Sequence, residues 1–303
     1  MEAGTPDLAK DDVRFLQTLL RDLRDEHFYP RAWRNFLARS WERSVNDARA
    51  YPALVWSTVV STVGLALVSA VWLALASMVA TRSQVVIMLV VAGCGLVLQQ
   101  GFVWLHLGMV EPLHGGPHLQ RIGVANNLTL VRMLAGWLLL AVAVSGIASR
   151  SLLLSIFLMG ALVDGIDGSV ARIFEQPTRL GRMLDAIADA LLFCVGATVF
   201  ADQEIIPLWF AVIVYLRFLA PLIWAIVSYF FALRPVRYEP TPWGKLAGAA
   251  LTAAFFTAGV RGQGVKSWQG GAQLFLVVVA ALMVTASAVQ LWSEHQRWSG
   301  KSG

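Results

Sequence analysis

Residues 164–189 read DGIDGSVARIFEQPTRLGRMLDAIAD, and this stretch joins two long apolar runs of the chain. Four aspartates stand in it, at or near the depth of a membrane: Asp164, Asp167, Asp185 and Asp189. An ionised aspartate at the centre of a spanning helix costs about 2.5 to 3.5 kcal/mol on insertion scales. Four of them therefore require compensating charge or water.

Apolar runs long enough to cross a bilayer dominate the rest of the chain. Of its 303 residues, 57% are hydrophobic and 14% are charged, and the mean hydropathy is +0.63. A spanning helix needs about 20 apolar residues. Eight runs come close to that length: 52–80, 85–108, 127–147, 151–173, 183–201, 205–232, 245–262 and 271–293. We expect an all-α, polytopic membrane helix bundle.

The positions of the basic residues and of the cysteines indicate which partners and which kinds of site to expect. Although the formal net charge is +5, Lys and Arg lie mostly at the ends of the apolar runs, where they suit anionic lipid headgroups rather than nucleic acid. Their excess on one side predicts that both termini are cytoplasmic, and we expect no signal peptide. Cys94 and Cys194 have neither the number nor the spacing of a disulfide framework or zinc site, and we interpret both as packing residues.

Changes in polarity divide the chain into segments. The expected segments are a cytoplasmic amphipathic segment at 1–50, a spanning two-helix front section at 51–108, a linker at 109–125, a six-helix core at 126–294 and a polar tail at 295–303. In the first segment, apolar residues recur at helical spacing on both sides of Pro30, which predicts two amphipathic helices. Such helices lie in the headgroup plane or against a partner subunit.

The spacing of the aspartates predicts a metal site. On a helix, residues three or four apart share a face, so Asp164 pairs with Asp167 and Asp185 with Asp189. Two such helices side by side would form a cluster of four carboxylates. Mg²⁺ and Mn²⁺ prefer oxygen ligands, and two such ions can also clamp a substrate's phosphates. We therefore expect two divalent metal ions held by all four aspartates, the alternative being ion pairs at helix ends.

Small residues and an arginine follow the first aspartate pair. Gly168 and Ala171 leave room on the helix surface for a diphosphate. Arg172 can form forked hydrogen bonds to phosphate oxygens, a geometry that lysine does not reproduce. These three positions predict that the substrate carries phosphate.

The pattern D-x-x-D-G-x-x-A-R, a short spacer and G-x-x-x-D-x-x-x-D runs from Asp164 to Asp189. With it, the sequence resembles the CDP-alcohol phosphatidyltransferase family over roughly residues 120–294. The resemblance implies a dimeric enzyme with a six-helix core, a cytoplasm-facing cavity, two metals on the four aspartates and Asp189 as general base. It also implies transfer of a phosphatidyl group from CDP-diacylglycerol to an alcohol, with release of CMP.

The resemblance extends beyond the aspartates. Residues 126–132, NNLTLVR, resemble the family's P-N-x-L-T-x-x-R segment, with Ala125 in place of the proline. The substrate-binding residues that the resemblance implies are Asn126, Thr129, Arg132, Gly168, Ala171, Arg172, Thr178, Gly181, Arg217 and Lys245. Of these, Arg217 and Lys245 match basic positions of members whose acceptors carry phosphate.

The nearest subgroup by these motifs is that of the phosphatidylglycerophosphate synthases. Residues 177–190 resemble its T-R-L-G-x-x-L-D-P-x-A-D-K segment, but Ala186 and Ala190 replace the Pro and Lys, and Phe218 replaces an acidic residue. Glycerol 3-phosphate is the favoured acceptor, with inositol phosphate, phosphatidylglycerol or another alcohol as alternatives. We expect an integral multi-pass enzyme of a prokaryotic cytoplasmic membrane, in contact with membrane lipids.

Two other classes of membrane protein also carry acidic residues within their helices. An intramembrane prenyltransferase also binds metal and diphosphate through aspartates on helices, but with a different spacing and without the D-G-x-x-A-R run. An ion-coupled transporter would show paired repeats with broken helices, and no such repeat is visible in the sequence.

Overall fold

The computed structural model describes residues 18–112, 119–147, 149–174, 178–232, 241–261 and 270–298. Within these ranges it leaves the side chains of 164–174, 229, 231, 232, 261, 294, 295, 297 and 298 undescribed. Its named elements are helices: α2 (Pro30–Ala50), α3 (Pro52–Ser77), α4 (Arg82–Leu105), the short 3₁₀ helix η1 (Leu107–Met109), α5 (Val124–Val144), α6 (Arg150–Phe174), α7 (Arg179–Asp202), α8 (Leu208–Ala232), α9 (Pro242–Arg261) and α10 (Gly271–Trp298). The predicted all-α fold is confirmed.

The eight predicted apolar runs all become helices, α3 to α10. Among the described residues, six of these helices are long and apolar enough to cross a membrane: α3, α4, α5, α7, α8 and α10. The described side chains of α6 cover only Arg150–Val163, an apolar stretch that is shorter than these spans. The predicted polytopic bundle is therefore confirmed, while membrane crossing by α6 and α9 stays a prediction.

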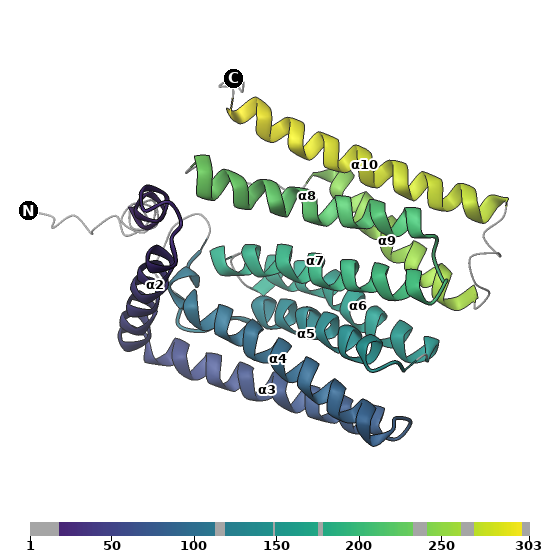
Figure 1. The fold of residues 1–303 in the computed structure, drawn as a ribbon, viewed down its shortest axis with the longest axis horizontal. Coiled ribbons are helices and arrows are strands. Elements are labelled where there is room, and N and C mark those ends of the chain that lie inside the picture. The colour runs from purple at the N-terminus through teal and green to yellow at the C-terminus, as the bar shows by residue number, and fades with distance from the viewer. Residues whose placement is uncertain are drawn as a thin grey trace, which may run out of the picture.

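The helices α3 to α10 lie side by side, with α3 and α4 along one flank and α8 and α10 along the other (Figure 1). Helix α5 packs along α4, α6 and α7, and is therefore the centre of the structure. The first turns of α5 and α7 lie at the same end of the bundle as the last turns of α6 and α8 (Figure 1). Helix α2 runs across this end, which we call the α2 end.

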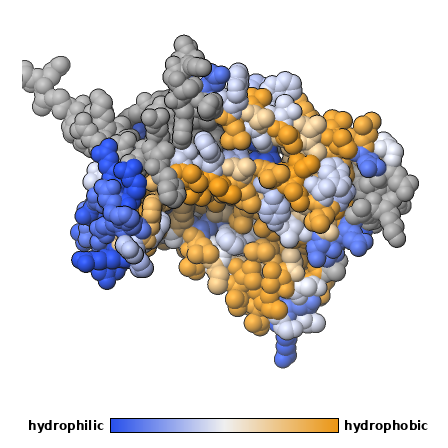
Figure 2. Space-filling model, turned by 45° about the horizontal axis from the view of Figure 1, so that its top comes forward, coloured by the Kyte–Doolittle hydropathy of each residue, from blue (hydrophilic) through white to orange (hydrophobic). Residues whose placement is uncertain are grey.

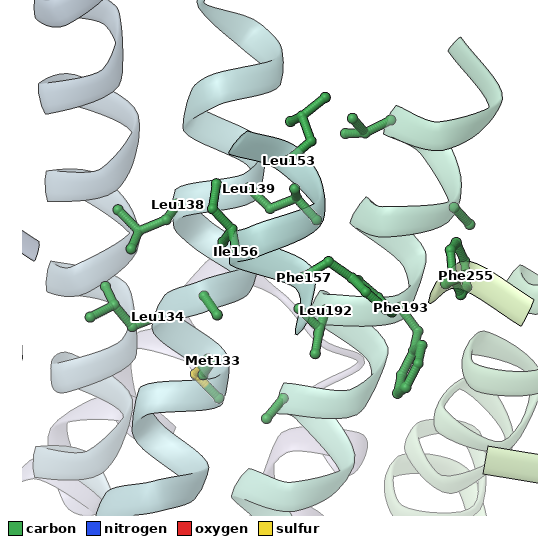
Figure 3. Packing of buried hydrophobic residues seen from close by; sticks show 14 of the residues in the cluster. Met133, Leu134, Leu138, Leu139, Leu153, Ile156, Phe157, Leu192, Phe193 and Phe255 are labelled. Carbon is green, nitrogen blue, oxygen red and sulfur yellow. The ribbon is translucent and has the colours of Figure 1, made fainter. Parts of the chain in front are cut away.

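Aromatic and leucine side chains fill the space between the central helices (Figure 3). The ring of Phe157 on α6 lies 5.7 Å from that of Phe193 on α7 and 4.8 Å from that of Phe255 on α9, measured between centroids. Such ring pairs contribute about 0.5–1.5 kcal/mol beyond their buried area. The cluster thus fixes α6, α7 and α9 relative to one another.

Glycines allow α5, α6 and α7 to approach closely. A Cβ added at Gly136 of α5 would lie 2.8 Å from the Cγ of Leu191, and one added at Gly160 of α6 would lie 2.8 Å from Leu192 Cδ2. Small residues are the usual means of close packing between membrane helices. At the start of α5, Gly123 has a φ of 82°, a conformation that glycine adopts without strain.

Hydrogen bonds between uncharged groups join the front section to α5. Among the described residues, Ser61 Oγ donates to Asn127 Oδ1 and Gln99 Nε2 donates to Leu130 O (2.9 Å), and just before α5 Ile122 N donates to Ser57 Oγ (3.0 Å). Polar side chains commonly hold membrane helices together in this way. The front section is therefore packed onto the core and is not a separate unit.

The structure settles two further predictions. Residues 18–25 are helical, the chain turns at His27 and Phe28, and α2 begins at Pro30, so the predicted break is confirmed. Cys194 is buried as predicted, but Cys94 is exposed, and its interpretation as a packing residue was wrong. Helix α4 is apolar on all sides, so its sequence does not distinguish a buried face from one that faces lipid.

Candidate active site

Thr178 and Asn126 join the first turns of α7 and α5. The Oγ1 of Thr178 accepts a hydrogen bond from Gly181 N (2.9 Å) as the N-cap of α7, and donates to Asn126 Oδ1 (3.2 Å). A capping threonine stabilises a helix by about 1 kcal/mol. A Cβ at Gly181 would overlap Asn126 Oδ1 and lie 2.9 Å from Thr178 Oγ1. Only glycine at this position permits both contacts.

Substrate binding was predicted for these residues and for Thr129, and in the structure their polar groups contact other parts of the protein. Asn126 and Thr178 are 4% and 5% exposed, and the Nδ2 of Asn126 donates to Ile122 O (2.6 Å). Thr129, one turn further along α5, is also buried and donates to Ala125 O (3.2 Å). In the structure, Asn126, Thr178 and Gly181 thus lie together and connect the first turns of α5 and α7. Their contact with a substrate stays a prediction.

A contact that the sequence analysis missed holds the linker against the start of α7. Buried Glu111 forms an ion pair with Arg179 (2.7 Å), and its carbonyl oxygen accepts a hydrogen bond from Arg179 N (3.1 Å). An isolated bridge also pairs Pro112 with Thr178. A carboxylate directly after an apolar run was the only sequence signal of this contact.

Arg132 forms ion pairs with Asp185 and Asp189 of α7. Its Nη2 donates to Asp185 Oδ1, and its Nη1 lies 3.0 Å from Asp189 Oδ1. The side chain of Arg132 is 0% exposed, whereas those of Asp185 and Asp189 are 54% and 30% exposed. The guanidinium therefore supports the carboxylates from inside the bundle while their other sides remain accessible.

This arrangement explains how charges are tolerated at this depth. A buried guanidinium is costly without ionic partners and satisfied hydrogen bonds, and α5 packs against α7 so that one arginine meets two carboxylates. Because Asp185 and Asp189 are four residues apart on α7, both reach the same guanidinium. The face shared by this pair, predicted from spacing, is confirmed by its common partner.

The first aspartate pair, Asp164 and Asp167, lies on α6, which also packs against α5. Helix α6 is continuous through positions 164 and 167, so the three-residue spacing falls on a helix as expected. The side chains of five predicted site residues lie outside the described ones: Asp164, Asp167, Gly168, Ala171 and Arg172. Their roles stay predictions.

Arg217 is a second basic residue of the site, in addition to Arg132. It lies within α8, and its Nη1 donates to Gln290 Oε1 of α10 (3.0 Å). The charge of Asp189 acts on it favourably. A Cβ added at Gly244 would lie 3.4 Å from Arg217 Nη2, so Arg217 reaches the first turn of α9, where exposed Lys245 follows. Gln290 was not among the predicted residues, and its only signal in the sequence is an amide within an apolar run.

The described side chains fit a divalent metal in their chemistry. Carboxylate oxygens are the donors that Mg²⁺ and Mn²⁺ prefer, and Asp185 and Asp189 present accessible carboxylates from one helix face. Within the described part of the chain, no group of three or more potential ligands occurs. Two of the four predicted ligands, Asp164 and Asp167, lie outside that part.

Fold and site together define a class: a polytopic helical membrane protein with acidic and basic residues held between its helices. Comparison with known families identifies the class more closely. A model of the CDP-alcohol phosphatidyltransferase family matches residues 122–293. The chain therefore belongs to the CDP-alcohol phosphatidyltransferase family of transferases.

Two relatives share part of this region. A CDP-diacylglycerol–glycerol-3-phosphate 3-phosphatidyltransferase of Aquifex aeolicus is 30% identical over 142 residues, which are 46% of this chain and 76% of that protein. A cardiolipin synthase (CMP-forming) of Streptomyces coelicolor is 29% identical over 116 residues, which are 38% of this chain and 39% of that protein. The chain thus matches well under half of the synthase. No solved structure shows significant similarity to this chain.

Proposed function

We propose that this protein transfers a phosphatidyl group from CDP-diacylglycerol to the hydroxyl group of an anionic acceptor, glycerol 3-phosphate, and releases CMP. The observation that carries the proposal is the pair Asp185 and Asp189, held on one face of α7 by buried Arg132. This pair is the second half of the aspartate motif, in a chain that belongs to the CDP-alcohol phosphatidyltransferase family.

The proposed cofactor is a pair of Mg²⁺ or Mn²⁺ ions. Asp185 and Asp189, together with Asp164 and Asp167 of α6, would hold them. When bound, such ions neutralise the charge of the substrate diphosphate and of the departing CMP. The partly exposed carboxylates of Asp185 and Asp189 support this assignment.

Asp189 is the proposed general base. As the acceptor oxygen attacks the β-phosphorus of CDP-diacylglycerol, its hydroxyl proton must leave, and a nearby carboxylate can accept it. A new P–O bond to the acceptor forms while the P–O bond to CMP breaks. Arg132 orients Asp189 through its ion pair, which limits the geometries that the base samples.

Arg217 is the proposed binding group for the acceptor. It lies within α8 and donates a hydrogen bond to Gln290 of α10, and the negative charge of Asp189 acts on it. An arginine can bind a phosphate through two parallel hydrogen bonds. A phosphate held there would bring the acceptor's hydroxyl toward Asp189. The Aquifex aeolicus relative, whose name specifies glycerol 3-phosphate, agrees with this choice.

Phosphatidylglycerol is the second acceptor that an observation favours. The Streptomyces coelicolor relative is named a cardiolipin synthase. Phosphatidylglycerol also offers a phosphate and a free hydroxyl, so Arg217 and Asp189 suit it on the same grounds. Inositol phosphate meets the same two requirements.

We further propose that the α2 end faces the cytoplasm and that the protein is a homodimer. The orientation is supported by the excess of Lys and Arg in the segments assigned to that side. Labelling of single introduced cysteines from each side of sealed vesicles tests the orientation, and the mass of the detergent-solubilised protein tests the dimer.

The reaction is tested by CMP release from CDP-diacylglycerol by purified protein with Mg²⁺ or Mn²⁺. Glycerol 3-phosphate, phosphatidylglycerol, inositol phosphate, inositol and serine are supplied in separate reactions. We expect release with glycerol 3-phosphate. Release only with phosphatidylglycerol or inositol phosphate would replace the acceptor and keep the reaction, whereas no release with any of them would contradict the proposal.

A further inference from the structure

Helix α2 lies across the ends of the spanning helices and contacts the bundle near both of its own ends (Figure 1). Near its C-terminus, Ser44 Oγ donates to Leu105 O at the end of α4 (2.7 Å), and Ala48 packs against the core. Near its N-terminus, the ring of Trp33 lies 5.7 Å from that of Phe230, close to the end of α8. Helix α2 is therefore held where the spanning segments end, which is the level of the lipid headgroups.

One face of α2 combines these contacts with exposed apolar side chains. Trp33, Leu37, Trp41, Ser44 and Ala48 follow at intervals of four, four, three and four residues, so they share a face. Ser44 and Ala48 contact the bundle, whereas Trp33, Leu37 and Trp41 are 37%, 50% and 54% exposed. The three large side chains therefore point toward the membrane side of the helix while lacking full cover from protein.

The opposite face of α2 is polar. Arg31, Asn35, Glu42, Asn46 and Arg49 are all exposed there. Across the whole helix, five arginines and two acidic residues give a formal net charge of +3. Arginines at a membrane surface attract anionic headgroups, and they extend their charged ends toward water while their stems lie on apolar surface.

The surface of the whole molecule is also divided into a hydrophilic part and a hydrophobic part. The hydrophilic surface of α2 borders directly on the hydrophobic surface of the spanning helices (Figure 2). Trp33 of α2 lies against Phe230 near the end of α8, and tryptophan is enriched where membranes meet water. A bilayer around the spanning helices would therefore reach Trp33, Leu37 and Trp41 without any movement of α2.

We infer that α2 is a membrane-surface helix that binds the anionic headgroup layer of the bilayer that the chain spans. Trp33, Leu37 and Trp41 insert at the boundary between headgroups and acyl chains, and the arginines contact lipid phosphates. This surface is separate from the aspartate site. It does not depend on the proposed reaction.

Spin labels at matched positions test the inference in the full-length protein. The natural cysteines are replaced by Cys94→Ala and Cys194→Ala, and a label is attached at Leu37→Cys or, as the control on the polar face, at Glu42→Cys. Trp41→Cys provides a second position on the apolar face. Each variant is placed in nanodiscs of phosphatidylcholine alone or with phosphatidylglycerol, and its collisions with oxygen and with a water-soluble nickel complex are measured.

We expect the ratio of oxygen to nickel collisions to be several-fold higher at positions 37 and 41 than at position 42. Phosphatidylglycerol should raise that ratio further at positions 37 and 41. Equal ratios at all three positions, or no response to phosphatidylglycerol, would overturn the inference. A short distance between labels at position 37 on two copies of the chain would also overturn it, since a second copy would then cover this face.

Discussion

The central helices and the front section differ in how much of their surface protein covers. Of the most apolar 18 residues of α5 and α7, 61% and 56% are buried, against 28% in both α3 and α4. The charges of the site lie in the covered pair: Arg132 in α5, and Asp185 and Asp189 in α7. The contacts between α3, α4 and α5 use uncharged groups such as Ser61 and Gln99.

This difference shows where a membrane protein can hold charged groups. A charge at membrane depth needs an ionic partner or water, and Arg132 finds its partners because α5 packs against α7. An uncharged hydroxyl such as that of Ser61 needs only a hydrogen-bonding partner, which a single helix neighbour can supply. The charged residues of the site thus lie between helices that bury each other. The front section contributes packing and uncharged hydrogen bonds.

The largest effect is expected from Asp189→Asn. Loss of the general base should lower CMP release by about 10³-fold, while binding of the CDP-lipid is partly retained. Asp202→Asn, at the last residue of the same helix, is the matched control and should leave turnover unchanged. Wild-type turnover in Asp189→Asn would show that the active site does not lie at the ion pairs of Arg132 with Asp185 and Asp189.

A stability cycle tests the ion pairs of Arg132. The double variant Asp185→Asn/Asp189→Asn removes two charged partners of a buried guanidinium, and should lower the free energy of unfolding by about 3 kcal/mol. In an Arg132→Met background the same two substitutions should cost much less. Unfolding in detergent micelles measures both losses. Equal losses in the two backgrounds would show that Arg132 does not stabilise the carboxylates.

Arg217→Ala should act on the acceptor alone. Loss of charge-assisted hydrogen bonds to the acceptor phosphate should raise the acceptor's KM by about 10-fold or more, with the KM for CDP-diacylglycerol nearly unchanged. Gln290→Leu should give a smaller change in the same direction. Arg82→Ala, at the start of α4, is the control. A rise in both KM values would contradict a role specific to the acceptor.

The smallest effects are expected in the front section. Ser61→Ala and Gln99→Leu each remove one contact with α5, and should each lower the free energy of unfolding by about 0.6 kcal/mol. The kcat should stay within about two-fold of wild type, because these contacts hold no charge. A loss of kcat comparable to that of Asp189→Asn would abolish the distinction between the two regions.

The sequence predicted the helices well because the bilayer dictates their length. The predicted run 183–201 became Arg179–Asp202, and the break at Pro30 is where α2 begins. The grouping of Asp185 with Asp189 was also predictable, since helical spacing alone places them on one face.

Contacts between helices could not be predicted in the same way. The sequence shows Gln290 only as a polar residue within an apolar run, and the family resemblance implied substrate binding for Arg132 without indicating its ion pairs. Their partners, Asp185 and Arg217, lie on other helices and depend on how those helices rotate and pack. Cys94 illustrates the same limit, because in an apolar helix lipid-facing and buried positions have the same composition.

The central claim is that paired carboxylates supported by Arg132 carry out a metal-dependent transfer. Its most direct test is CMP release by wild-type protein before and after treatment with EDTA, followed by addition of Mg²⁺ or Mn²⁺. We predict that EDTA abolishes release and that either ion restores it. Release that continues undiminished in excess EDTA would contradict the account.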